Sequence, residues 1–250
     1  MVNYISNFDT TAELATFSAT TDFGRPHVSL TKDDSKVHYF EDPYNGHQYV
    51  EIGGLKWATM NVGANSVTDT GLYFSWGDTQ GYTAAQVGSG EGQKYFGWTD
   101  YKYNSGGTLP SAADMTKYNS TDGKTMLEAS DDAARANWGG SWRMPTKDEY
   151  AALFNAVNTA WTSSYNSSGV AGIICTDKTD SSKVLFFPAC GFCGTGSVYT
   201  VGSSGTYWSS SLYSSDVRNT HSLYLANFGV DYQYNIPDRY YGYPVRGVVG

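Results

Sequence analysis

The sequence predicts an α+β protein with two helices, a small irregular antiparallel sheet and long loops. Short segments rich in β-branched and aromatic residues, bounded by Gly, Asn, Asp or Pro, recur along most of the 250-residue chain. Only two stretches carry helical signals, and residues 81–128 are polar, without a sustained period. Many short strands with few helices are typical of the α+β class. The sequence shows no repeat of roughly 20–50 residues, which argues against a propeller or a solenoid.

Strand-like segments lie on both sides of a loop signal at residues 42–46, whose sequence is Asp-Pro-Tyr-Asn-Gly. This signal places a domain boundary near residue 45. Residues 1–45 are expected to form a short, strand-like attachment or oligomerisation segment, and residues 46–250 the main domain. The predicted strands are 13–17, 27–30, 36–40, 49–52, 55–60, 71–76, 172–175, 183–188, 206–210, 222–228 and 243–249.

Two helices are predicted between these strands. The first, residues 130–137, opens with Ser130 as its capping residue, followed by two Asp residues whose negative charges suit the N-terminal end of a helix. The second begins after Thr146, which forms a capping box with Glu149. The apolar residues behind this box recur at helical spacing and predict one buried face: Tyr150, Leu153, Phe154 and Val157.

Composition and charge exclude several classes of protein. The chain has 16 Lys and Arg against 24 Asp and Glu, a net charge of −8, so nucleic acid, whose binding depends on basic groups at its phosphates, is not an expected partner. The aromatic content of 16% argues against a disordered chain. No segment approaches the roughly 20 apolar residues of a membrane helix, so no membrane insertion is expected. The first residues lack the basic start and apolar run of a signal peptide.

Few residues suggest catalysis or metal binding. Cys190 and Cys193 have the spacing of a redox or zinc half-site, but no second Cys or His pair accompanies them. Together with Cys175, they are expected to be small buried apolar side chains. The nucleophile motif G-x-S-x-G is missing, so the sequence predicts no enzyme and no catalytic residue. No cofactor and no complete calcium loop is predicted, although a structural calcium held by loop carbonyls stays open.

The tail, residues 207–246, has an unusual composition. It holds eight of the 21 tyrosines, and no Lys follows Lys183 and no Glu follows Glu149. Lys and Glu are depleted at protein interfaces, whereas Tyr and Arg are enriched, and Tyr gives a large contact area with few torsions to restrict. Tyr207 and Trp208 are expected in a buried strand. The later tail residues, interleaved with Asp, Asn, Arg and Pro, favour a binding surface.

Five motifs resemble a known family. They are Gly-Leu-Lys-Trp-Ala-Thr-Met-Asn-Val-Gly (54–63), Gly-Leu-Tyr-Phe-Ser-Trp-Gly-Asp (71–78), the block at 131–146 that contains Trp-Gly-Gly-Ser-Trp-Arg-Met-Pro, Tyr-Trp-Ser-Ser-Ser (207–211) and Tyr-Pro-Val-Arg (243–246). In this order they resemble the Fibrobacter succinogenes major paralogous domain, common in Bacteroidetes proteins and their phages. The resemblance covers roughly residues 47–250. The family is similar to the C-type-lectin-like fold in its formylglycine-generating-enzyme branch.

The same fold hosts the variable proteins of diversity-generating retroelements, in which a C-terminal stretch is rewritten at template adenines. Asn-type codons there change to Tyr, Asp, His, Ser, Thr, Ile, Arg and others, but never to Lys, Glu, Gln, Met or Trp. From residue 212 to residue 246 only Gln233 falls outside this set. The resemblance implies the following ligand-binding display residues: Tyr213, Asp216, Arg218, Asn219, His221, Tyr224, Asn227, Asp231, Tyr232, Tyr234, Asn235, Asp238, Arg239, Tyr240, Tyr241 and Tyr243.

The resemblance implies a non-enzymatic protein that binds a protein or glycan receptor on a cell surface. It would act in a virion as a phage tail receptor-binding protein, or as a bacterial surface adhesin, and a homo-oligomer is compatible with both. Two departures matter. The ending Val-Arg-Gly-Val (245–248) replaces the usual Val-Arg-Pro-Val. Cys190 and Cys193 do not map onto the reactive cysteine pair of the formylglycine-generating enzymes, so their catalysis is not implied.

Three alternatives stay open from the sequence. The first is a glycan-binding surface module without diversification, in which Tyr or Trp faces would stack on sugars. The second is an enzyme of the formylglycine-generating type. The third is a structural virion or fimbrial component, whose tail side chains would be buried between subunits.

Overall fold

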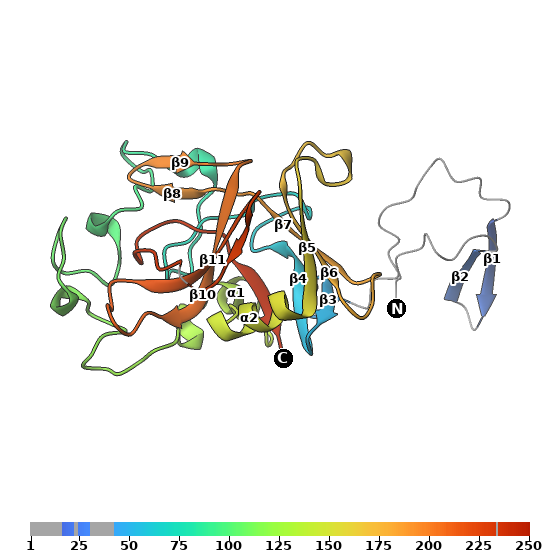
Figure 1. Cartoon of the computed structure of the whole chain (residues 1–250), viewed down its shortest axis with the longest axis horizontal. Helices are drawn as coiled ribbons and strands as arrows, with labels where there is room; N and C mark the ends of the chain where they lie inside the picture. Colours follow the sequence, from blue (N-terminus) through green and yellow to red (C-terminus); the bar gives the residue numbers. More distant parts are fainter. Residues whose placement is uncertain (1–16, 23–24, 31–42, 234) are drawn as a thin grey trace. The chain divides into compact units, whose positions relative to one another are not determined.

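The computed structural model describes residues 17–22, 25–30, 43–233 and 235–250 (Figure 1). The chain divides into two compact units, residues 1–43 and 44–250, next to the boundary expected near residue 45. In the first unit, β1 (Phe17–Asp22) and β2 (Arg25–Leu30) pair as an antiparallel hairpin. The strand predicted at 36–40 and most of the one predicted at 13–17 lie outside the described residues.

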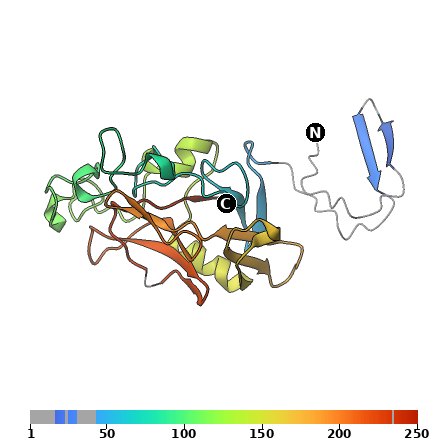
Figure 2. The same cartoon turned by 90° about the horizontal axis from the view of Figure 1, so that it is seen from above.

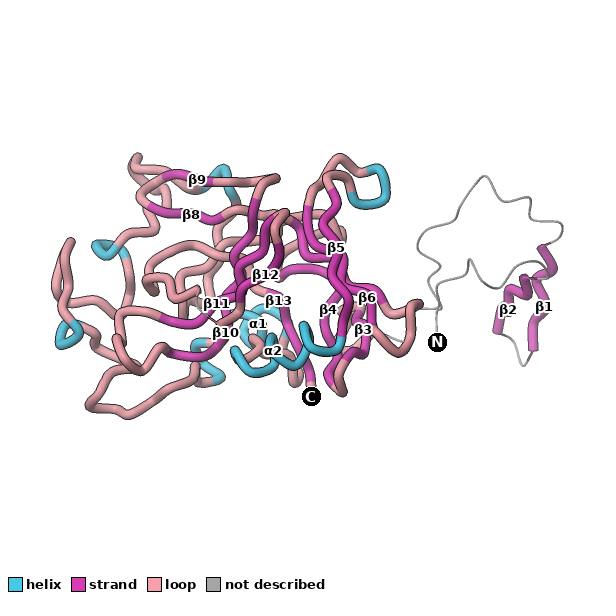
Figure 3. The backbone as a smooth tube through the Cα atoms, viewed as in Figure 1, coloured by secondary structure: helices cyan, strands magenta, loops and turns pink. Residues whose placement is uncertain are grey.

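The second unit is a mixed α+β structure of small antiparallel sheets (Figure 1). Its described part contains three-stranded sheets in the orders β13-β4-β3, β5-β6-β7 and β10-β11-β12, and a β8-β9 hairpin. Loops make up much of the rest (Figure 3). The strands are β3 (Tyr49–Ile52), β4 (Leu55–Asn61), β5 (Val157–Thr162), β6 (Gly172–Asp177), β7 (Val184–Pro188), β8 (Phe192–Gly194), β9 (Ser197–Tyr199), β10 (Ser204–Leu212), β11 (Thr220–Ala226), β12 (Gly229–Asp231) and β13 (Arg246–Val249).

Helix α2 (Lys147–Ala156) confirms the predicted capping box. The Glu149 amide donates to the Thr146 hydroxyl at 3.1 Å, and the Thr146 amide donates to the Glu149 carboxylate at 2.8 Å. Both groups satisfy amides that a helix start leaves without partners. The predicted buried face is also present: Tyr150, Leu153 and Phe154 on the helix, and Val157 as the first residue of β5.

Helix α1 (Ala133–Trp138) begins two residues later than expected. Residues 129–131 form a 3₁₀ turn, so the predicted cap Ser130 is wrong and Asp132 takes that role. The Asp132 carboxylate accepts from the Arg135 amide at 3.0 Å and from the Met144 amide at 2.8 Å. One side chain therefore caps α1 and also holds the chain that leads into α2.

Tryptophans form much of the core of the second unit. Trp57, Trp76, Trp142 and Trp208 are each at most 1% exposed. Their indole N–H groups tie distant segments together, since Trp76 donates to the Ser209 carbonyl at 2.9 Å and Trp208 donates to the Phe74 carbonyl at 2.6 Å. The prediction that Trp208 lies in a buried strand is confirmed. None of the described helices is long and apolar enough to span a membrane.

The polar stretch at residues 81–128 gathers at one end of the second unit, away from β5, β6 and β7 (Figure 1; Figure 2). It contains short 3₁₀ turns, such as Trp98–Asp100, and no strand or α-helix, as expected. The strand predicted at 71–76 is wrong. That segment makes only single bridges, from Tyr73 to Tyr82 and from Phe74 to Tyr243, and these connect the loops to the tail.

Candidate ligand-binding surface

The predicted display residues come from three adjoining parts of the tail: the loop between β10 and β11, β11 with its turn into β12, and the segment from β12 to β13. Strand β11 pairs with both β10 and β12, so one sheet supports all three parts. Asn227 is exposed, and Tyr234 lies outside the described residues. The half-buried display residues are Tyr213, Asp216, Arg218, Asn219, Tyr224, Asp231, Tyr232, Asn235, Asp238, Tyr240 and Tyr241.

The expectation of an exposed position is wrong for three display residues. Arg239 is 0% exposed, Tyr243 5% and His221 9%. The Tyr243 ring packs on Trp208 with 4.2 Å between ring centroids, because the bridge to the 71–78 segment draws its backbone into the core. His221 lies on β11, where the hydroxyl of Ser209 donates to its carbonyl at 2.7 Å. All three belong to the scaffold beneath the surface.

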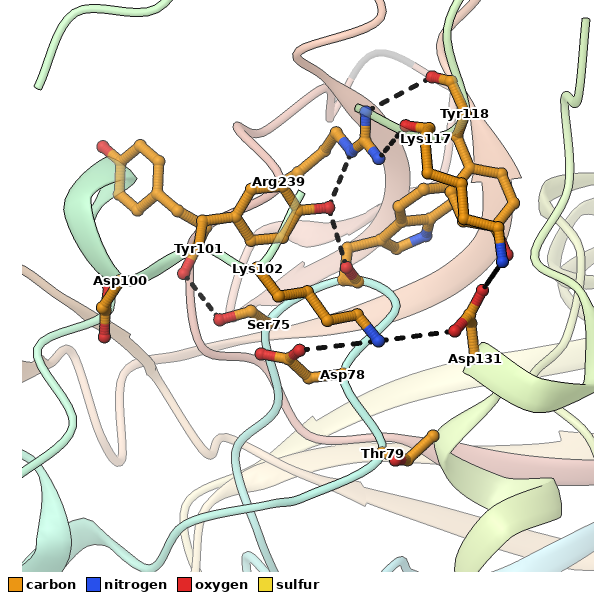
Figure 4. A network of polar contacts seen from close by, with 12 residues as sticks. Ser75, Asp78, Thr79, Asp100, Tyr101, Lys102, Lys117, Tyr118, Asp131 and Arg239 are labelled. Atoms are coloured by element: carbon orange, nitrogen blue, oxygen red, sulfur yellow. Dashed lines mark hydrogen bonds and ion pairs between the residues drawn. The ribbon is translucent and has the colours of Figure 1, made fainter. Parts of the chain in front are cut away.

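The Arg239 guanidinium has hydrogen-bond partners from three separate segments, and Figure 4 shows those at residues 101 and 117–118. It donates to the Tyr101 hydroxyl at 2.8 Å and to the carbonyls of Lys117 and Val217, each at 2.8 Å. A longer bond reaches the Tyr118 carbonyl at 3.3 Å. Arg239 therefore connects the tail to the 81–128 loops and to the β10–β11 loop.

Aromatic rings enclose the same guanidinium. Its central carbon lies between 4.9 and 5.8 Å from four ring centroids, which belong to Trp76, Tyr101, Tyr103 and Tyr118. Such contacts are favourable for a desolvated cation. Arg239, which was predicted to be a display residue, is therefore buried and connects the tail to the loops.

An ion-pair network lies beside the rings that surround Arg239 (Figure 4). The Lys102 ammonium lies 3.8 Å from Asp78 and 3.4 Å from Asp131, and Lys117 also pairs with Asp131. Burial would raise the pKa of Asp131, but hydrogen bonds from Lys117, Tyr103 and Tyr118 outweigh it and hold this pKa well below its usual range. For Asp78 burial dominates, and its pKa is raised.

The variant Asp131→Asn is expected to be about 2 kcal/mol less stable than wild type at pH 7. A carboxyl whose pKa is lowered by folding stabilises the folded chain above its unfolded pKa of about 4, and this stabilisation is lost as pH falls toward the folded pKa. The difference between the two proteins should therefore shrink in urea denaturation at pH 3. An equal difference at both pH values would contradict this role, since the unchanged carboxyls contribute equally to both proteins.

An aromatic strip runs along the surface and contains only two predicted residues. We define it as Trp98, Tyr240, Tyr241, Phe192 and Tyr199. Successive ring centroids lie 4.9, 4.4, 5.6 and 5.1 Å apart. All five rings are half-buried except Tyr199, which is 39% exposed. The three rings outside the tail carry no sequence signal, because only the fold brings the loops and the β8–β9 hairpin beside it.

Polar contacts hold the tail segments in register beside this strip. The Asn219 side-chain amide donates to the Asp238 carboxylate at 2.9 Å, across two segments of the tail. Arg218 donates to Asp216 at 2.6 Å and to the Pro110 carbonyl at 3.2 Å, so a loop of the 81–128 stretch borders the surface. The predicted polar residues are therefore partly occupied with each other.

A second apolar feature, the exposed Phe228, was not predicted from the sequence. Phe228, expected at the end of a strand, lies in the tight turn between β11 and β12 and is 80% exposed. Its ring lies 6.1 Å from that of Tyr224. The Asn-Phe-Gly sequence at 227–229 is the available signal, since Asn and Gly favour hairpin turns. This large side chain at a hairpin tip adds to the exposed apolar area of the tail.

The cysteines are buried and unpaired, as predicted. Burial raises the pKa of Cys175 to about 12, and it also raises the pKa values of Cys190 and Cys193. Among the described residues, no three His, Cys, Asp or Glu side chains gather in a group that could hold a metal ion.

No family model matches this chain, and comparisons with curated proteins and with solved structures found no match.

Proposed function

We propose that this chain is a non-enzymatic ligand-binding protein with a C-type-lectin-like fold, related to the Fibrobacter succinogenes major paralogous domain. Its tail displays a diversified surface of Tyr, Asp, Asn and Arg. In a phage tail it would bind a receptor on the host cell, and on a bacterium it would act as a surface adhesin. The mixed α+β scaffold with two short helices and small sheets is compatible with this fold.

One observation carries the proposal. Half-buried Tyr, Asp, Asn and Arg side chains from three parts of the tail lie on a scaffold with four buried tryptophans. The tail also lacks Lys and Glu. Rigid aromatic side chains supply contact area at low entropic cost, and short polar groups supply adaptable hydrogen bonds. A rigid scaffold with variable side chains is the arrangement that antibody loops use.

Sequencing the tail across clonal relatives tests the diversification. We expect differences at the exposed and half-buried display residues, including Asp238, Tyr240 and Tyr241, and few or none at the buried Arg239 and Tyr243. The locus should carry a reverse transcriptase and a template copy of the tail rich in Asn codons. Differences spread evenly along the chain would contradict the proposal.

Glycan binding is the second candidate, and the aromatic strip favours it. Sugars stack on aromatic faces, and five neighbouring rings offer several such positions. A glycan array distinguishes the two candidates. Binding that is lost in Tyr240→Ala and Tyr241→Ala would support a glycan site, and background signal across the array would leave a protein receptor.

A further inference from the structure

Asp238 is a half-buried carboxylate without an ion pair among the described residues. It accepts a hydrogen bond from the Asn219 side chain at 2.9 Å, and Tyr240 also hydrogen-bonds to it. The neighbouring cation Arg218 is bound elsewhere, since its Nε donates to Asp216 at 3.0 Å and its Nη2 at 2.6 Å. Asp238 therefore lies where part of its water is excluded, and none of the described cations is within ion-pair distance of it.

One aromatic residue, Tyr240, hydrogen-bonds to this carboxylate, and two further rings adjoin the Tyr240 ring. The Tyr240 ring packs edge-on against Trp98, with 4.9 Å between centroids, and lies tilted against the Tyr241 ring, with 4.4 Å between centroids. Trp98 and Tyr241 are themselves half-buried. The faces of Trp and Tyr rings attract cations, and arginine makes this contact more often than lysine. Carboxylate and rings therefore favour the same kind of group.

The position is costly in the unbound protein. Burial raises the pKa of Asp238, although the Asn219 amide and the Arg218 charge act in the opposite direction. A partly desolvated carboxylate whose hydrogen bonds come only from neutral groups is less stabilised than one in an ion pair. Groups of this kind occur at functional sites, where stability is lower than it could be. A cation supplied from outside would remove the cost.

We propose that Asp238, Tyr240, Trp98 and Tyr241 form a binding site for one cationic side chain, arginine or lysine, of a protein ligand. The Asp238 carboxylate accepts hydrogen bonds from the guanidinium or ammonium group, and the rings pack against its aliphatic stem. This inference rests on the proposed ligand-binding function and names the chemistry of the ligand. Charge pairs that lose their water at an interface contribute strongly to specificity.

Selection from a random peptide display library, with the full chain as the target, tests this cation-binding site. Wild type is expected to enrich peptides that contain Arg or Lys. Asp238→Asn keeps the oxygen that accepts from Asn219 and removes the charge, so it should bind the enriched peptides at least about tenfold more weakly. Its melting temperature should be unchanged or higher, which separates lost binding from lost folding. The matched control is Asp180→Asn, which removes an exposed charge in the β6–β7 turn and should bind like wild type.

Replacing the basic residue of the best peptide by Gln should weaken binding by the same factor, and a Lys-for-Arg exchange identifies the preferred cation. The inference is overturned if the enriched peptides carry no excess of Arg or Lys, or if Asp238→Asn binds them as wild type does. In that case peptides that still bind through the tail leave the proposed function intact. If the wild type enriches no peptide, the inference of a cation-binding site is overturned, and the glycan array then decides whether the surface binds a ligand.

Discussion

Arg239→Ala is expected to lower the free energy of unfolding by about 3–5 kcal/mol. The substitution removes a guanidinium that is 0% exposed and leaves the Tyr101 hydroxyl and three carbonyls without their donor. Buried acceptors that lose their partner cost about 1–3 kcal/mol each, although relaxation and water recover part of this. The four rings around the guanidinium would also face an empty space. Chemical denaturation measures the change.

Arg218→Ala is the matched control in the same tail. Arg218 is half-buried, and its charge pairs with Asp216 near solvent, so its loss should cost at most about 1 kcal/mol. Hydrogen exchange adds the location of the effect. In Arg239→Ala, amides near Lys117 and Val217 should lose protection before the β5–β7 sheet does. Equal stability losses in the two variants would contradict a special role for Arg239.

Local sequence signals predicted those parts of the fold that depend on local chemistry. The capping box works because Thr146 and Glu149 lie three residues apart, so each reaches the other's amide whatever the rest of the chain does. The buried face of α2 and the buried Tyr207 and Trp208 follow from apolar pattern in the same way. The class, α+β with small antiparallel sheets, depends on many such signals together.

The burial of Arg239 could not be read from the sequence. Arg and Tyr occur in the tail at buried and at half-buried positions alike. Neither the residue type nor the codon pattern therefore tells which side chains are buried. What places Arg239 inside is the set of carbonyls at residues 117, 118 and 217, which only folding brings to one point. The contact between Trp98 and Tyr240 could not be predicted for the same reason, because the two residues are far apart in the sequence and only folding brings them together. The buried and the half-buried residues of the tail therefore separate only in three dimensions.

If the tail is diversified as we propose, this separation limits which of its residues can vary. Asp238 and Tyr240 flank Arg239 in the chain and are half-buried, while the buried Arg239 holds the same segment to the loops. Substitution of the two neighbours changes what the surface contacts without removing that attachment. The diversity that we propose for this surface would be compatible with stability, because substitutions away from buried attachments usually cost little.

Arg246→Ala is expected to destabilise the protein by a similar amount, about 3–5 kcal/mol. Arg246 is 0% exposed and donates to the Asn61 side chain at 2.9 Å, the Ala58 carbonyl at 2.9 Å and the Phe186 carbonyl at 3.0 Å. Its guanidinium lies 4.6 Å from the Phe187 ring centroid. These contacts join β13 and β4 to β7, which belongs to another sheet. Arg246→Lys should not restore stability, because one ammonium cannot reproduce a planar fork with three separate acceptors.

Arg246→Met separates the charge from the hydrogen bonds. Burial disfavours the cation and so lowers the pKa of Arg246, and no carboxylate pairs with it among the described residues. Replacing a buried charge by an apolar side chain of similar length can be neutral when the partners remain satisfied. Here three acceptors would lose their donor, so Arg246→Met should still cost about 2 kcal/mol or more. Arg143→Ala, which removes a partly exposed Arg paired with Glu149, is the control and should cost at most about 1 kcal/mol. Wild-type stability in Arg246→Met would show that the three hydrogen bonds only offset the cost of burying the charge.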